Sequence, residues 1–300
     1  MRKLFAILTV LAFTAGMAFA QQNTAAVNQD GNNHVAEVSQ TGLLNDANVQ
    51  QTAGGSDYAS VTQLGEENEA FVNQNGAAGT HYAKVDQQGD RNEAIIDRQG
   101  MWGSGLGQAF ITQIGDDNEA FQNQHANKAS YASIYQEGDN NDAYQNMAAG
   151  FSGGGTGHTA YITQVGNKND AWQHQRGKGH YAAIIQEGND NYAKMRQDNG
   201  GTEIYNNWAK IDQEGDNNWA GVDQDGNENT FDLEQVDDGN KVFGLLADEM
   251  FKQDGDGNLA TMLQQGNNNR VFGGQFGDSH TMVVSQIGNG NTATVTQAGF

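Results

Sequence analysis

The fold of this chain is decided by a stretch that reads Gln213-Glu214-Gly215-Asp216-Asn217-Asn218-Trp219-Ala220-Gly221-Val222-Asp223-Gln224. It is one copy of the pattern Q-x-G-x-x-N-x-A-x-h-x-Q, in which h is an apolar residue. Pairs of glutamines 11 residues apart recur from Gln29 and Gln40 to Gln286 and Gln297. A fixed short period is typical of a stacked repeat, which offers long regular surfaces rather than one deep pocket.

Each copy combines a short strand with a tight turn. In Ala209–Gln213 every second residue is of the inward type, while Lys210 and Asp212 would face outward, and this period of two predicts a half-buried strand. The G-x-x-N piece supplies turn residues. We count 24 such strands, from 25–29 to 293–297. The sequence therefore predicts an all-β, two-sheet β-solenoid of about twelve strand-turn-strand coils with parallel, in-register stacking, and a rod roughly 55–60 Å long.

Two kinds of turn alternate, so the rod should have two different edges. One kind, the strict edge, repeats the same amides, which should form hydrogen-bonded ladders along the axis. Its glutamines are Gln40, Gln63, Gln87, Gln113, Gln136, Gln164, Gln186, Gln213, Gln235, Gln253, Gln275 and Gln297. Its asparagines are Asn45, Asn68, Asn92, Asn118, Asn141, Asn169, Asn191, Asn218, Asn240 and Asn258, after which comes His280.

The other kind, the loose edge, varies in both residues and length. Its glutamine position admits Arg98, Met147 and Leu246, and the long insertions, such as 148–159 and 198–206, fall here. Its asparagine position holds His34, Asp57, His81, Gly107, Ser130, His158, His180, Asn207, Asn229, Ala247, Asn269 and Asn291. Only seven residues lead from Leu246 to Gln253, so we expect the tenth coil to be distorted.

The composition indicates an exported chain. Arg2 and Lys3 precede the apolar run 4–15, and Ala18-Phe19-Ala20 resembles a cleavage site, so we predict a signal peptide over 1–20 and one repeat domain over 21–300. Removing the two cations takes the formal charge from −22 to −24, which argues against binding nucleic acid or anionic lipid, and no later stretch is apolar enough to insert in a membrane. The chain has no cysteine and no proline, so neither disulfides nor proline breaks interrupt the ladders.

The repeats resemble the curlin repeat, the building unit of curli-type functional amyloid fibres. The shared pattern, S/N-x-A-x-h-x-Q-x-G-x-x-N-x-A-x-h-x-Q, covers nearly all of residues 25–297. The resemblance implies a subunit that self-assembles outside a bacterial cell into a pilus or fimbrium and serves adhesion and biofilm matrix. It also implies a possible nucleator and an outer-membrane secretion pore as partners. The chain departs from the family in its length, in its long insertions and in the absence of a targeting stretch between Gln21 and the repeats.

Two sets of titratable residues are candidate sites. Five histidines, His34, His81, His158, His180 and His280, occupy the asparagine position, where imidazole can replace an amide; His158 and His180 should stack in successive coils and respond to pH. Acidic residues follow the turn glycine and should stack as a column: Glu66, Asp90, Asp116, Asp139, Asp216, Asp238, Asp256 and Asp278. We expect a turn-forming role for these acids and no cofactor or metal, with calcium uptake as the weaker alternative, because the calcium nonapeptide of β-rolls is absent.

Outward aromatic residues form the third candidate site. Phe71, Ile95, Phe121, Tyr144 and Trp172 should line one sheet in consecutive coils, and Tyr58, Tyr82, Tyr131, Tyr181 and Trp208 the other. Such a strip either stabilises the sheet by cross-strand pairing or is an interface for fibre packing or adhesion.

The sequence predicts a structural protein and not an enzyme. It contains no G-x-S-x-G, H-E-x-x-H, P-loop or dinucleotide fingerprint. The alternatives are a monomeric or surface-attached solenoid adhesin that binds through its loose edge, a nucleator, and an ice-binding solenoid. The last needs a regular threonine array, whereas Thr62, Thr112 and Thr163 are interrupted by other residues.

Overall fold

The structure is a computed structural model that describes residues 22–52, 55–76, 80–100, 107–125, 130–149, 157–198, 206–245 and 249–299. The signal peptide predicted for 1–20 and the loose-edge positions Leu246 and Ala247 lie outside these ranges. Within them the chain forms strands and turns and no helix, so none of this part has a helix that could cross a bilayer.

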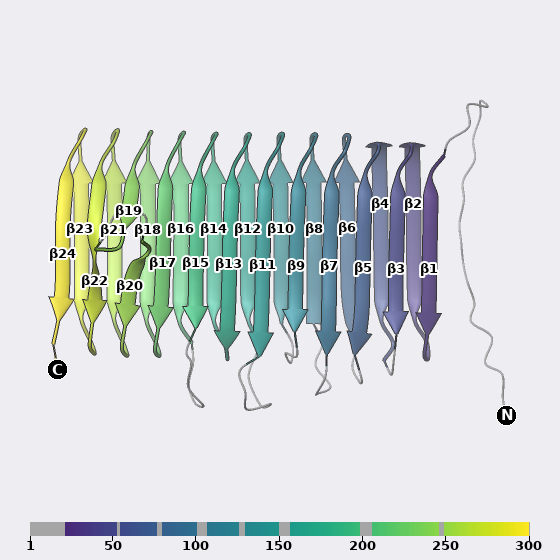
Figure 1. Cartoon of the computed structure of the whole chain (residues 1–300), viewed down its shortest axis with the longest axis horizontal. Helices are drawn as coiled ribbons and strands as arrows, with labels where there is room; N and C mark the ends of the chain where they lie inside the picture. Colours follow the sequence, from purple (N-terminus) through teal and green to yellow (C-terminus); the bar gives the residue numbers. More distant parts are fainter. Residues whose placement is uncertain are drawn as a thin grey trace.

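Two parallel sheets lie face to face along the whole rod (Figure 1). We call the thirteen-stranded sheet sheet A and the eleven-stranded one sheet B. Sheet A contains β1 (Thr24–Asp30), β3 (Asp46–Thr52), β5 (Glu69–Gly76), β7 (Glu93–Gly100), β9 (Glu119–His125), β11 (Asp142–Ala149), β13 (Asp170–Gly177), β15 (Tyr192–Asp198), β17 (Trp219–Asp225), β19 (Lys241–Phe243), β20 (Phe251–Asp254), β22 (Arg270–Phe276) and β24 (Thr292–Ala298). Sheet B contains β2 (Val35–Leu43), β4 (Tyr58–Glu66), β6 (His81–Gln88), β8 (Gly107–Ile114), β10 (Tyr131–Glu137), β12 (Thr159–Val165), β14 (Tyr181–Glu187), β16 (Trp208–Glu214), β18 (Thr230–Val236), β21 (Leu259–Gln265) and β23 (Thr281–Ile287).

Equivalent residues of successive coils pair in register. Between β1 and β3, for example, Ala25 pairs with Ala47, Val27 with Val49 and Gln29 with Gln51. Alternate residues point inward, so inside the rod the alanine and the apolar residue of most copies are buried between the sheets in one large core, beside which Ala132, Met147 and Ala160 form a small second cluster. The predicted two-sheet β-solenoid with parallel, in-register stacking is therefore confirmed.

The expected distortion lies where the sequence placed it, but its form differs. The strands β19 and β20 both pair with β17 and with β22, so they are two halves of one interrupted strand. The irregular segment is thus an insertion within a strand and not a shortened coil. The described residues consequently form eleven and a half coils, slightly fewer than the twelve predicted.

Glycine is required at the turns because successive coils touch there through their backbones. Gly115 has a φ of +117°, and a Cβ built on it would lie 2.2 Å from the carbonyl oxygen of Gly138 in the next coil. Gly89 meets Gly115 in the same way, at 2.1 Å. A side chain at this position would force neighbouring coils apart.

Candidate functional site

The strict edge carries an uninterrupted glutamine ladder at the ends of the sheet B strands. Each side-chain nitrogen donates to the side-chain oxygen of the next glutamine, from Gln40 through to Gln286. Gln136 is typical: its Nε2 donates to Gln164 Oε1 at 2.9 Å and also to the backbone oxygens of Glu119 at 2.9 Å and Asn141 at 3.0 Å. The side chain is fully buried, so these bonds satisfy groups that water does not reach.

An asparagine ladder accompanies it on the same edge. The backbone N–H of each asparagine donates to the side-chain oxygen of the asparagine one coil before, as Asn68 does to Asn45 at 3.0 Å. The ladder runs through Asn23, Asn45, Asn68, Asn92, Asn118, Asn141, Asn169, Asn191, Asn218, Asn240, Asn269 and Asn291.

The edge assignment predicted beyond Gln235 is wrong. Gln235 donates to Gln264, and Gln264 to Gln286, so these two continue the strict ladder. The predicted strict members Gln253, Gln275, Gln297 and Asn258 instead belong to the loose edge. The physical reason is the interruption between β19 and β20, which adds residues to one strand without adding a turn, so every later position changes edge.

When the later positions are assigned to their correct edges, every residue that replaces a ladder glutamine or asparagine in the described ranges lies on the loose edge. Its glutamine ladder is broken at Arg98 and Met147, and Gln175 Oε1 is left buried without a hydrogen bond beside Met147. The guanidinium of Arg98 lies against Gly107, where a Cβ would collide with it unless the arginine side chain moved. Burial lowers the pKa of Arg98 to about 10.

All five histidines predicted at the asparagine position lie in one column on the loose edge. The rings of His158 and His180 are stacked as expected, with centroids 5.2 Å apart and planes within 4°. Burial, together with the adjacent His180, lowers the pKa of His158 to about 3, so His158 is neutral at physiological pH. Earlier in the column, Asp57 lies between two histidines, 2.8 Å from His81 Nδ1 and 3.5 Å from His34 Nδ1.

The turn acids form a third ladder. Each carboxylate accepts the backbone N–H of the preceding coil: Asp90 from Glu66 at 2.8 Å, Asp116 from Asp90 at 2.8 Å, and Asp139 from Asp116 at 2.9 Å. Asp216 and Asp238 continue it on the strict edge, whereas Asp256 and Asp278 lie on the loose edge. This geometry explains the acidic and amide residues at this position as turn-forming groups.

A second carboxylate column, on the outer face of sheet A, was missed in the sequence. Six acids stack in register just before the inward alanine, and no ion pair involves them in the described ranges: Asp46, Glu69, Glu93, Glu119, Asp142 and Asp170. Partial desolvation and the neighbouring carboxylates raise the pKa of Glu93, and that of Asp142 to about 6. The signal was present in the sequence as the acidic residue that separates each strict asparagine from Asn45 to Asn169 from the following alanine.

The predicted aromatic strip on sheet A lies in one outward column. Phe71, Ile95, Phe121, Tyr144 and Trp172 pair in succession, with ring centroids 5.1 Å apart for Phe121 and Tyr144 and 6.0 Å apart for Tyr144 and Trp172. Lys194 Nζ then lies 4.8 Å from the centre of the Trp172 ring.

The outer face of sheet B carries a longer aromatic row than predicted. The predicted column is interrupted by Gln108 and Thr159, but Phe110 and Tyr161 from the adjacent column bridge these gaps. The result is one continuous series of neighbouring rings, namely Tyr58, Tyr82, Phe110, Tyr131, Tyr161, Tyr181 and Trp208. The rings of Tyr58 and Tyr82 and those of Tyr181 and Trp208 are stacked, whereas the other contacts of the row are tilted.

Three core glutamines were also missed. Gln122, Gln145 and Gln173 occupy the apolar position of the pattern and bond to one another at 3.1 and 3.2 Å. They form a short internal ladder across β9, β11 and β13. The sequence pattern did not predict this ladder, because it expects Val or Ile at these three positions.

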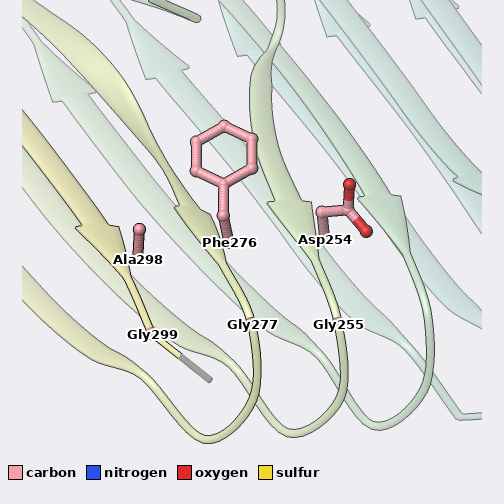
Figure 2. Close-up of a pocket in the computed structure, with 6 residues that line it drawn as sticks. All are labelled: Asp254, Gly255, Phe276, Gly277, Ala298 and Gly299. Carbon is pink, nitrogen blue, oxygen red and sulfur yellow. The ribbon is translucent and has the colours of Figure 1, made fainter.

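Potential metal ligands do not cluster in the described residues. No group of three or more His, Asp or Glu that could hold a metal ion occurs in these ranges. Figure 2 shows a depression lined by Asp254, Phe276, Ala298 and the glycines Gly255, Gly277 and Gly299. Its one charged side chain, Asp254, is already bonded to Lys252 Nζ at 2.9 Å.

The fold and the ladders define a structural β-solenoid whose coils are held together by stacked amides. A family model described as the curlin associated repeat matches residues 174–198, 206–236, 252–272 and 274–299. Four segments within residues 174–299 are thus curlin repeats, as the sequence pattern indicated. A search of curated proteins returned no match.

Proposed function

We propose that this protein is an exported structural subunit that self-assembles end to end into extracellular, curli-type amyloid or fimbrial fibres for cell adhesion and biofilm matrix. The observation that carries the proposal is the regularity of the stack: both sheets and the strict-edge ladders repeat from coil to coil, so a second copy can extend them without a new kind of contact. Self-assembly of this kind is what curlin repeats imply.

The two end strands support this proposal. In the described part of the chain, β1 pairs only with β3, and β24 only with β22. Val27 and Val295 are only partly buried at these ends, whereas their counterparts inside the rod are fully buried. An unpaired strand with an apolar face is a template for another chain.

The aromatic strip of sheet A is the surface that we propose for lateral packing or adhesion. Serine at Phe71, Phe121, Tyr144 and Trp172 should reduce fibre bundling and adhesion while leaving β content intact. The matched control places serine at Tyr58, Tyr82, Tyr131 and Tyr181 on sheet B. Unchanged bundling and adhesion in the sheet A variant would refute the role of the strip.

The proposal requires neither catalysis nor a cofactor. Because the turn carboxylates accept backbone N–H groups, we expect the same melting curve in calcium as in sodium at matched ionic strength. A higher melting temperature in calcium would instead favour metal uptake along the acidic turns.

Incubation of the purified, exported chain with an amyloid dye, followed by electron microscopy, tests the assembly. We expect fibres, and we expect Thr294→Pro to suppress them. The N–H of Arg270 in β22 points toward β24, so by register the N–H of Thr294 points to the free edge, where proline removes a donor without disturbing the pairing with β22. Thr294→Ser is the control, and persistent monomer of the unmodified chain would instead favour an adhesin or nucleator that binds through its loose edge.

A further inference from the structure

The described residues form an odd number of strand levels. When β19 and β20 are counted as one interrupted strand, sheet A has twelve levels and sheet B has the eleven of its strand order. At the C-terminal end of the described residues, β24 is the last level of sheet A, and the next level of the spiral would lie in sheet B, next to β23. The two ends of the rod are therefore offset by half a coil.

This offset distinguishes two ways of adding a second copy of this chain. If the copy keeps the same orientation, its β1 lies on β24, and one level is missing in sheet B between β23 and the copy's β2. The backbone groups that border this gap then have no strand partner, which is costly. If the copy is turned by half a revolution about the rod axis, its β1 lies on β23 and its β2 on β24, and the gap disappears.

The strand directions are compatible with this exchange of sheets. The strands of the two sheets run in opposite directions, as the arrowheads in Figure 1 show. Half a revolution about the rod axis moves sheet A to the side of sheet B and also reverses the direction of its strands. The copy's β1 therefore becomes parallel to β23, as the pairing inside the rod requires.

We infer that successive subunits of the fibre are related by half a revolution about its axis, so that strict and loose edges alternate along each side. The inference rests on the proposed end-to-end assembly. The glutamine ladders fit it, because on both edges each Nε2 donates toward the C-terminal end. Gln286 and Gln297 therefore present donors at one end of the rod, and Gln29 and Gln40 present acceptors at the other.

The asparagine positions fit as well. The joint places an asparagine after a histidine on one side and a histidine after an asparagine on the other, and both orders already occur inside the rod. The turned copy places Asn23 after His280, and Asn207 donates its backbone N–H to His180 Nδ1 at 3.2 Å in the same arrangement. It also places His34 after Asn291, and His280 donates its backbone N–H to Asn258 Oδ1 at 3.0 Å in that arrangement. The joint thus repeats contacts that the fold already makes.

Gold labelling of fibres tests this geometry, since the chain has no native cysteine. Glu228→Cys places one label in an exposed turn of the loose edge. A half-coil offset over eleven and a half coils predicts labels on alternate sides of the fibre, about 55 Å apart along the axis and about 110 Å apart on each side. Labels confined to one side, about 55–60 Å apart, would overturn the inference.

A variant with an even number of levels is the matched control. A duplicate of residues 287–297 inserted after Gln297 adds one strand and one turn, so the offset disappears and labels at Glu228→Cys should all lie on one side. Alternating labels in this variant would also overturn the inference. If the unmodified chain forms no fibres at all, the proposed assembly fails and this inference fails with it, whereas fibres with one-sided labels leave the assembly standing.

Discussion

The two edges of the rod are built from the same eleven-residue pattern but tolerate different changes. On the strict edge every glutamine of the ladder, from Gln40 to Gln286, bonds to the next, and the asparagine ladder is also unbroken. On the loose edge Arg98, Met147 and five histidines replace amides. The difference teaches that one intact edge is enough to keep the coils in register, while the other can vary in residue and in length.

The largest effect should come from adding a side chain where coils touch. Gly115→Ala places a methyl group 2.2 Å from a backbone oxygen that cannot move alone, so we expect it to lower the free energy of unfolding by more than about 4 kcal/mol. Gly290→Ala is the control, because it has a φ of +69° and no atom within 4 Å of the added carbon, and should cost about 1 kcal/mol. Denaturant unfolding of both variants measures this, and equal losses would contradict it.

Breaking the strict glutamine ladder should have the next largest effect. Gln136→Met removes the amide nitrogen that contacts three buried acceptors, on Gln164 and on two backbone carbonyls, and also the amide oxygen that accepts from Gln113 Nε2. We expect a loss of about 3 kcal/mol of unfolding free energy. Because Met147 occupies the same position on the loose edge, the variant makes the strict edge resemble the loose one, and a loss below about 1 kcal/mol would show that the ladder contributes little.

The histidine column should make the loose edge sensitive to acid. The pKa of His158 is about 3 in the folded chain and near 6.5 when unfolded, so the unfolded state binds the proton more tightly. The contribution of His158 to the free energy of unfolding is complete above about pH 6.5 and declines as the pH falls toward 3. At pH 4 the free energy of unfolding is lower by about 3 kcal/mol. His158→Asn should lessen this decline in unfolding experiments at pH 8 and pH 4, and an unchanged pH dependence would contradict the assignment.

Repairing the loose edge should give the smallest effect and the opposite sign. Met147→Gln places a donor next to Gln175 Oε1, which now has no hydrogen bond, so we expect a gain of about 1 kcal/mol. The lost packing of Met147 against Ala132 and Ala160 offsets part of this gain. Thermal unfolding should give a higher midpoint than that of the unmodified chain, and a lower midpoint would mean that packing outweighs the ladder here.

Much of this architecture could be predicted from the sequence because each coil repeats the same local chemistry. The alternation in Ala209–Gln213 and the glycine of each turn were sufficient for the strands, the sheets and the ladders. The edge of Gln253 was not predictable, because an insertion within a strand and a shortened coil give the same residue count between Gln235 and Gln253. Only the backbone pairing of β19 and β20 with β17 distinguishes them.

Some features of the candidate site depend on neighbours that the sequence does not bring together. Phe110 and Tyr161 complete the aromatic row of sheet B only because the two outer columns lie side by side in space. The raised pKa of Asp142 likewise depends on burial within the stack and on Asp170 and Glu119, each one coil away. Such contacts follow from the register of the coils and not from the spacing of residues in one copy.

The direction of the backbone hydrogen bonds has a mechanical consequence. They run along the length of the rod, from each strand to the next level of its sheet, as between Asp46 N and Asn68 O at 2.8 Å. A pulling force along the rod therefore acts on successive levels in series. Inside one chain the covalent turns also carry this load, so a tensile load should separate the rod from whatever is stacked on its ends before any coil opens.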